Sequence, residues 1–247
     1  MLTRLLRPSK PAAPPGQRVY AVGDVHGRID LLDRLLQMLE RDNAQRDPAQ
    51  TTIVFLGDLI DRGPASREVV ERVRIGVDWA KTTALMGNHE AVMLEALDGK
   101  SETLERWLRF GGLATLESWG LPGQFVEQST RREILCALRD AVTPDERGWL
   151  GRLRTSLRIG DYYFVHAGIR PGVPLDKQSD DDRLWVREEF LESRKFHGAM
   201  IVHGHSIHAT VEERHNRIGL DTGAYASNCL TAMGLEKTDR WYLDTVS

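Results

Sequence analysis

Five short strand-like segments of this chain each run into a polar side chain close to a glycine. The segments are RVYAV, TTIVFL, TTALM, DYYFV and AMIVH. Their length and their β-branched and aromatic residues are typical of buried strands. The carboxyl ends of strands in α/β sheets open onto one crevice, so we expect the following side chains to converge there. These are Asp24, His26, Asp58, Asn88, His89, His166 and His205.

Helical patterns between these segments predict an α/β fold. Apolar residues recur with helical spacing over 29–39, where Asp30 is the expected N-cap, and Ser66 is expected to cap a second helix. A third helix is predicted over 89–97. The C-terminal segments RIGLDT, NCLTAMGLE and RWYLDT predict an antiparallel meander. This order of elements favours mixed sheets, arranged as two sheets between helical layers.

We divide the chain into a tail and one domain that carries a helical insertion. Residues 1–17 contain basic residues and prolines without a sustained period, which predicts a mobile basic tail. Residues 18–247 are expected to fold as a single domain. Helical patterns interrupted by glycines predict an insertion over about 99–154. We expect this insertion to cover the crevice and to select substrates.

The composition narrows the classes of partner. A net charge of −3 creates no global field that favours nucleic acid or an anionic membrane. No apolar run approaches the roughly 18 residues that span a bilayer. Two isolated cysteines predict neither a disulfide framework nor a thiolate metal site. We therefore expect a cytoplasmic protein with no nucleic acid or membrane partner, and the oligomeric state stays open.

The polar groups at the strand ends are suited to binding metal ions. Carboxylate, carboxamide and imidazole groups without sulfur favour borderline divalent ions, with Mn²⁺ as our expectation and Fe or Zn as alternatives. The number of donors suits two ions, and a carboxylate such as Asp58 can bridge them. Two such ions can hold a hydroxide between them and clamp an in-line displacement at phosphorus. This chemistry predicts a hydrolase that acts on phosphoric esters.

Any one of these residues alone is an ordinary loop, cap or core residue, but together they form ordered motifs. The motifs are GDVHG at 23–27, GDLIDRG at 57–63, GNHE at 87–90, HAG at 166–168 and GH at 204–205. In this order they resemble the phosphoprotein phosphatase family of metallophosphoesterases, and most of all its short bacterial and phage lambda-type members. The resemblance implies a sandwich of two mixed β-sheets flanked by helices, with a binuclear metal centre.

The resemblance also implies a role for each motif residue. Asp24 and His26 would hold the first metal, and Asp58 would bridge the two. The second metal would be held by Asn88, His166 and His205, and Asn88 would also contact the phosphate.

The remaining motif residues would act on the substrate itself. His89 would donate a proton to the leaving group, and Asp61 would orient its imidazole. Arg62 would grip the phosphoryl oxygens, because a guanidinium can bind two of them at once. Arg187 resembles a second phosphate-binding arginine, and its alternative is a helix-surface residue paired with glutamates.

Several substrate classes are compatible with these motifs. We prefer a phosphomonoesterase acting on phosphoserine and phosphothreonine in proteins, with phosphotyrosine and small phosphoesters as further candidates. The alternative is a dinucleoside polyphosphate hydrolase, a class that typically has alanine where this chain has Asp61 and aspartate where it has Glu90. A non-catalytic binding module is disfavoured, because all ligand-type positions are present. The roles of His203 and His208 stay open, and His197 and His215 are given none.

Overall fold

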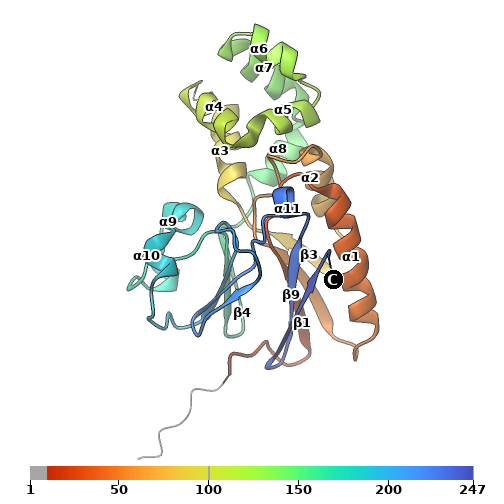
Figure 1. Ribbon diagram of the computed structural model, residues 1–247, viewed down its shortest axis with the longest axis vertical. Coiled ribbons are helices and arrows are strands. Elements are labelled where there is room, and N and C mark those ends of the chain that lie inside the picture. Colours follow the sequence, from red (N-terminus) through yellow and green to blue (C-terminus); the bar gives the residue numbers. More distant parts are fainter. Residues whose placement is uncertain (1–9, 100, 247) are drawn as a thin grey trace, which may run out of the picture.

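The computed structural model describes residues 10–99 and 101–246. Its strands form two five-stranded mixed sheets, with the orders β10-β9-β1-β2-β3 and β4-β5-β6-β8-β7 (Figure 1). In the first sheet the strands are β1 (Gln17–Val22), β2 (Gln50–Phe55), β3 (Lys81–Ala84), β9 (Thr231–Glu236) and β10 (Asp239–Asp244). In the second they are β4 (Ser156–Ile159), β5 (Tyr162–Val165), β6 (Met200–His203), β7 (Glu212–Glu213) and β8 (Arg217–Gly219). The predicted sandwich of two mixed sheets is confirmed.

Alternating side chains of β1 show how the sheets are packed. Tyr20 and Val22 face a core shared with the helices on the outer side of the first sheet. Val19 and Ala21 point the other way, into the core between the two sheets, where they join residues such as Phe164 of β5. The side chains of a strand alternate between its two faces, so a strand buried on both sides reads as one continuous apolar run.

Helices cover the outer faces of both sheets (Figure 1). The first sheet is covered by α1 (Ile29–Ala44) and α2 (Ser66–Ile75), and the second by α9 (Asp180–Trp185) and α10 (Glu188–Leu191). The helices α3 (Asn88–Leu97) and α11 (Ala224–Ser227) and the 3₁₀ turn Leu175–Lys177 complete this part. Among the described residues, no helix combines the length and the apolar character needed to cross a membrane.

The predicted helix caps were wrong at two positions. Arg28 occupies the N-cap position of α1, and Asp30 lies inside the helix, where it accepts hydrogen bonds from the Arg28 guanidinium at 2.9 and 2.7 Å. Ala65 is the N-cap of α2. The Ser66 hydroxyl accepts instead from the Asp61 backbone N–H at 3.0 Å. A tertiary contact therefore uses the hydroxyl that the local pattern assigns to capping.

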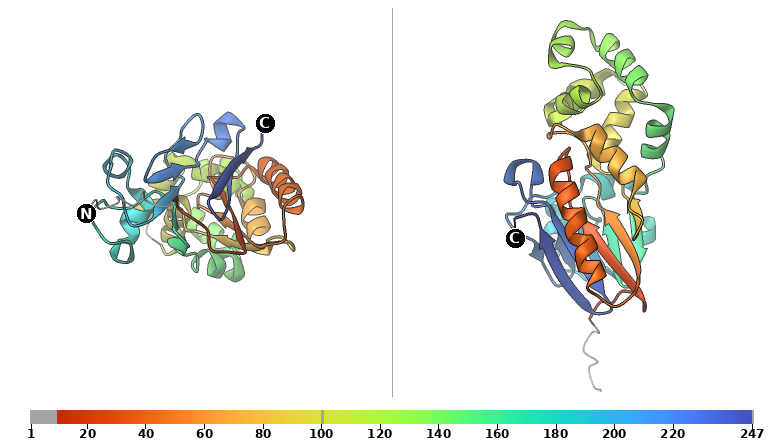
Figure 2. Two further views of the ribbon diagram at one scale, coloured as in Figure 1. Left: turned by 90° about the horizontal axis from the view of Figure 1, so that it is seen from below. Right: turned by 90° about the vertical axis from the view of Figure 1, so that its right-hand side faces the viewer.

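Five helices and a π-helical turn lie between α3 and β4 and extend beyond one end of the sandwich (Figures 1 and 2). They occupy the region predicted to be a helical insertion. The elements are α4 (Ser101–Trp107), the π turn (Leu108–Gly112), α5 (Leu113–Ser118), α6 (Gly123–Gln128), α7 (Arg131–Ala141) and α8 (Pro144–Leu150). Their buried residues, which include Trp107 and Trp119, continue the core on the outer side of the first sheet.

The C-terminal segments do not form the predicted meander. β8 pairs in parallel with β6 in the second sheet, whereas β9 crosses to the first sheet and forms an antiparallel hairpin with β10. The pattern of alternation identifies these strands but cannot say which sheet each one joins, because both sheets present a buried face.

The N-terminal segment also differs from the predicted mobile tail. Residues 1–9 of that tail lie outside the described residues. Ala13 is buried, and its N–H donates to the Lys237 carbonyl at 2.7 Å. Ala12 exchanges backbone and side-chain hydrogen bonds with Asp161. The segment next to β1 is therefore docked across the ends of both sheets, since its partners come from each of them.

Candidate metal centre

The strand-end side chains of both sheets meet at one end of the sandwich. Backbone hydrogen bonds join their loops: His26 N–H donates to the Asp58 carbonyl at 2.9 Å, and Gly204 N–H donates to the His166 carbonyl at 2.8 Å. His205 N–H donates to Asp24 Oδ2 at 3.0 Å. The loops that follow β1 and β2 of the first sheet therefore contact those that follow β5 and β6 of the second.

Asp58 belongs to two clusters of potential metal ligands. One contains His26, Asp58 and His89, and the other contains Asp58, His166 and His205, with the ligand atoms of each cluster within 4.8 Å of one another. Asp58 Oδ2 lies 3.6 Å from His26 Nε2, while Oδ1 lies 3.4 Å from His166 Nε2. Each carboxylate oxygen thus faces a different cluster, as a carboxylate shared by two cations would.

Orphaned polar atoms point to cations in this cluster. Asp24 Oδ1, His26 Nε2 and His205 Nε2 are buried without a hydrogen-bond partner among the described residues. His26 Nδ1 lies 2.7 Å from the Ile60 carbonyl, and His166 Nδ1 lies 2.9 Å from that of Leu56. A carbonyl can only accept, so both Nδ1 atoms carry the proton and both Nε2 atoms are left with a lone pair. Histidine ligands of metals are commonly oriented in this way.

The charges of the cluster also favour bound cations. Burial lowers the pKa of His26 to about 3 and also lowers the pKa of His166, so both imidazoles are neutral ligands at pH 7. Burial raises the pKa of Asp24, and so do the negative charges of Asp221 and Asp58. Divalent cations would remove this repulsion between buried carboxylates. The donor set therefore fits the metal ions expected from the sequence.

Asn88 and Glu90 lie at the start of α3 and serve different purposes. Asn88 Oδ1 lies 2.8 Å from His166 Nε2, within the second cluster. Glu90 faces the backbone instead: its carboxylate accepts from the N–H groups of Gly87, Asp58 and Leu59 at 2.8–2.9 Å. Glu90 thereby ties the loop after β2 to the loop after β3, a role that the motif alone does not reveal.

His89 and Asp61 form a buried pair beside the clusters. His89 Nδ1 lies 2.5 Å from Asp61 Oδ2, so His89 Nε2 is directed to Asp58 at 3.7 Å and to Arg62 Nη2 at 3.3 Å. Burial alone would lower the pKa of His89. The negative charges of Asp58 and Asp61, together with the hydrogen bond to Asp61, outweigh burial and raise it. The raised pKa favours the imidazolium form, in which Nε2 carries a proton, although the charge of Arg62 acts in the opposite direction.

The two arginines expected to bind phosphate differ in their surroundings. The Arg62 guanidinium lies over the Tyr225 ring, with 4.6 Å between its carbon and the ring centroid. Arg187 precedes α10 and is exposed, and its positive charge contributes to lowering the pKa of His166 and His205.

Asp221 is a further carboxylate of this centre that sequence reasoning missed. It is buried, and its Oδ1 accepts from the Gly223 N–H at 2.9 Å. Burial raises its pKa to about 6, and the charge of Asp58 acts in the same direction. Asp221 follows β8 by two residues, so the strand-end rule that predicts the other candidate ligands also applies to it.

Backbone strain is concentrated at the same residues. Seven non-glycine residues in the described part of the chain have positive φ, and five of them are residues predicted to form the site. These are His26, Asp58, Asp61, Arg62 and His205, with φ between 47° and 73°. Such conformations cost about 1–3 kcal/mol each and persist only where the surrounding contacts impose them.

Gly204→Ala is expected to weaken cation binding beside Asp24. An added Cβ would lie 2.0 Å from Asp24 Oδ1, so the carboxylate or the loop carrying His205 would have to move. We expect the affinity for Mn²⁺, measured by titration calorimetry, to fall by about 10–100-fold, as for the loss of groups that orient metal ligands.

The control is Gly148→Ala in α8, where the new Cβ would meet only the flexible end of Arg152 at 3.2 Å. This change should stabilise the helix by about 0.5–1 kcal/mol and leave Mn²⁺ binding unchanged. Wild-type affinity in Gly204→Ala would contradict a ligand role for Asp24.

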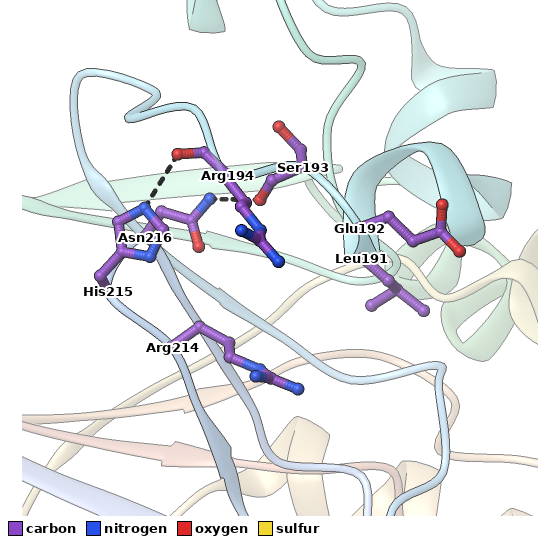
Figure 3. A pocket seen from close by; sticks show the side chains of 7 residues that line it. All are labelled: Leu191, Glu192, Ser193, Arg194, Arg214, His215 and Asn216. Atoms are coloured by element: carbon purple, nitrogen blue, oxygen red, sulfur yellow. Dashed lines mark hydrogen bonds between the residues drawn. The ribbon is translucent and has the colours of Figure 1, made fainter.

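A separate hollow lies between residues 191–194 and 214–216 and contains none of the predicted site residues (Figure 3). There His215 and Asn216 face the backbone of the neighbouring loop. His215 Nε2 lies 2.9 Å from the Arg194 carbonyl, and the Asn216 amide donates to the Ser193 carbonyl at 2.8 Å. These side chains hold a loop together, and His215 is outside the metal centre, in line with its lack of an assigned role.

The sequence is similar to those of known phosphoesterases. The chain matches the calcineurin-like phosphoesterase family over residues 17–228. Serine/threonine-protein phosphatase 1 of Salmonella typhimurium is 38% identical over 183 residues, which cover 72% of each chain. The symmetrical bis(5'-nucleosyl)-tetraphosphatase of Methylococcus capsulatus is 32% identical over 153 residues, which cover 62% of this chain but only 44% of that relative.

A solved structure shares the fold. The cold-active protein-tyrosine phosphatase of a psychrophilic Shewanella species superimposes with a TM-score of 0.57, covering 94% of this chain and 83% of that one. The two sequences are 20% identical, so the likeness concerns the fold alone.

Proposed function

We propose that this chain, which belongs to the calcineurin-like phosphoesterase family, hydrolyses the phosphoric esters of phosphoserine and phosphothreonine in proteins. The observation that carries the proposal is the buried pair of His89 and Asp61 next to the ligand clusters. Its importance follows from the leaving group, because the alkoxide of serine or threonine departs readily only when it is protonated.

We assign the metal ligands by the clusters and their orphaned atoms. Asp24 and His26 would hold one divalent cation, and Asn88, His166 and His205 the other, with Asp58 shared. Two cations held here, for which we propose Mn²⁺, would supply a water nucleophile of lowered pKa and would neutralise the charge of the phosphate. The preference for oxygen and imidazole donors over sulfur supports this choice.

His89 is proposed as the proton donor to the leaving oxygen. Its Nδ1 is occupied by Asp61, so Nε2 is the atom that can transfer a proton. As the bond between phosphorus and the ester oxygen breaks, the Nε2 proton passes to that oxygen. The products are the free hydroxyl of the protein side chain and inorganic phosphate, and His89 then regains a proton from solvent.

Two arginines and an amide are proposed to orient the phosphate. Arg62 has its guanidinium beside His89 Nε2, so a phosphoryl oxygen bound to Arg62 would lie next to the proton donor. Arg187 directly precedes α10, which covers the other sheet, and Asn88 is the first residue of α3. Oriented donors of this kind act by holding the reacting atoms in line.

A second candidate function is the hydrolysis of dinucleoside polyphosphates, which the similarity to a bis(5'-nucleosyl)-tetraphosphatase favours. In such a substrate the leaving group is a nucleotide phosphate, which needs no proton in order to depart. An aspartate that orients a general acid would contribute little to that reaction. The buried Asp61–His89 pair therefore supports the phosphomonoesterase over this alternative.

A comparison of three substrate classes, namely phosphopeptides, an aryl phosphate and a dinucleoside polyphosphate, tests the choice. The protein would be loaded in turn with Mn²⁺, Fe²⁺, Zn²⁺ or Mg²⁺ and assayed with phosphoserine and phosphothreonine peptides, p-nitrophenyl phosphate and diadenosine tetraphosphate. We expect kcat/KM for the phosphopeptides to exceed that for diadenosine tetraphosphate by roughly tenfold or more, which is about 1.4 kcal/mol. The opposite order would assign the protein to the second candidate function.

A further inference from the structure

Two residues of the helical insertion hold the Asp61 carboxylate. Trp107 Nε1 donates to Asp61 Oδ2 at 2.8 Å and to Oδ1 at 3.0 Å. The Thr115 hydroxyl donates to Oδ1 at 2.5 Å and accepts from the backbone N–H of Asp61 at 2.9 Å. Trp107, Thr115 and Asp61 have no solvent exposure. Asp61 is therefore fixed in both its side chain and its backbone by groups about 50 residues away in the chain.

The π turn of the insertion packs closely against the backbone of the loop that carries Asp61 and Arg62. Gly111 has φ of 102°, and its carbonyl accepts from the Arg62 N–H at 3.2 Å. A Cβ on Gly111 would lie 2.8 Å from Arg62 Cγ, and one on Gly112 would lie 2.8 Å from the Trp107 ring. The segment from Trp107 to Thr115 thus wraps closely around the Asp61–Arg62 turn, which is strained at both residues.

We propose that Trp107 and Thr115 are positioning residues for the proton donor, which they control by holding Asp61 against Nδ1 of His89. This inference rests on the proposed function of His89. Thr115 holds Oδ1, and Trp107 bridges Oδ1 and Oδ2, so the carboxylate is fixed with Oδ2 against the imidazole. The ring is then held with Nε2 toward the phosphate and Arg62. The insertion is in this view a part of the catalytic apparatus, in addition to any effect on substrate choice.

Without the hydrogen bonds from Trp107 and Thr115, the Asp61 carboxylate would orient the His89 imidazole poorly. Its side chain could rotate away from His89, and the left-handed backbone of Asp61 could relax. Misplacement of a catalytic group by about 1 Å can cost on the order of 100-fold in rate. Because the metal ligands lie outside these contacts, the loss should be confined to the step that requires the proton.

The test compares Thr115→Val, Thr115→Ser and Trp107→Phe in the full-length, Mn²⁺-loaded protein. We expect kcat for a phosphoserine peptide to fall about tenfold or more in Thr115→Val and Trp107→Phe. The kcat for p-nitrophenyl phosphate, whose leaving group needs little protonation, should fall less than about threefold. Thr115→Ser keeps the hydroxyl and should restore the wild-type ratio between the two substrates.

Two matched variants control for loss of packing in the insertion. Trp119 is also buried, but its Nε1 has no hydrogen-bond partner among the described residues, so Trp119→Phe removes an indole without touching Asp61. Thr103→Val removes a buried hydroxyl of α4 in the same way. Both controls should retain the wild-type ratio. Equal losses on both substrates in Thr115→Val and Trp107→Phe would show that these residues act through stability alone and would overturn the proposal.

A spectroscopic readout separates this inference from the proposed function. Proton NMR of the protein loaded with Zn²⁺, which is diamagnetic, and labelled with ¹⁵N-histidine should show a downfield Nδ1 proton of His89, bound to Asp61. We expect this signal to be lost by exchange in Thr115→Val, and to persist in Thr115→Ser, Trp119→Phe and Thr103→Val. A wild-type protein inactive on every phosphoester would refute the proposed function, yet the NMR comparison would still decide whether Thr115 holds the pair. An unchanged signal in Thr115→Val refutes the inference.

Discussion

Asp58→Asn is expected to abolish metal binding and catalysis together. The two carboxylate oxygens of Asp58 face different imidazoles, at 3.6 Å from His26 and 3.4 Å from His166. An amide has a single acceptor oxygen and no charge, so it cannot be shared by two divalent cations. Loss of a group that merely supports a metal ligand costs about 10–100-fold in affinity. Loss of the shared ligand should exceed this range, and kcat should fall to the background level.

Metal content after dialysis and kcat for p-nitrophenyl phosphate are the two measurements for Asp58→Asn. The matched control is Asp33→Asn, which removes an exposed carboxylate of α1 paired with Arg72. It should keep both metals and full activity, because an exposed pair contributes only about 0–1 kcal/mol. If Asp58→Asn retained two metals per chain and wild-type kcat, the shared site would be in another place.

The proximity of the candidate ligands could be predicted because each one follows a strand within a few residues. Asp24, Asp58 and His166 are brought to one end of the molecule by β1, β2 and β5, although the strands belong to two sheets. A pattern of strands shows where each one ends but not which sheet it joins. The convergence was therefore predictable, whereas the assignment of each strand to one of the two sheets was not.

Asp221 was missed because the topology of the strand before it was predicted wrongly. It follows β8, a strand parallel to β6 in the second sheet, and therefore reaches the same end as His205. Assigned to an antiparallel meander, this segment has no reason to approach the crevice. The pairing of β8 with β6 therefore decides whether Asp221 is placed at the site or is read as a turn residue.

The partners of Asp61 could not be predicted from local patterns. The family motif identifies Asp61 and His89, but Trp107 and Thr115 approach from 46 and 54 residues away. A buried tryptophan in a helical pattern is more often a core residue, and Trp107 is one as well. Its hydrogen bond depends on the π turn and on the left-handed backbone of Asp61, and neither feature has a reliable signature in the sequence.

His89→Asn is expected to slow the hydrolysis of phosphoesters, and the loss in kcat should be larger for esters with poorer leaving groups. The metal ligands keep their side chains, so metal content should stay at the wild-type level. General acid catalysis contributes about 10²–10⁴-fold, and kcat for a phosphoserine peptide should fall by this amount, with a much smaller loss for p-nitrophenyl phosphate. A series of aryl phosphates should show a steeper dependence of log kcat on the pKa of the leaving phenol in the variant.

The dependence on pH gives the same prediction an independent test. The pKa of His89 is raised, and only its protonated form can serve as the acid. Hence kcat for the phosphoserine peptide should fall as the pH rises through that pKa in the wild-type protein, and this fall should be absent in His89→Asn. His215→Asn, an imidazole bonded to the Arg194 carbonyl away from the centre, is the control and should behave as wild type. Equal losses for good and poor leaving groups in His89→Asn would mean that His89 supports the site without donating a proton, and the choice of phosphoserine over a polyphosphate substrate would lose its physical basis.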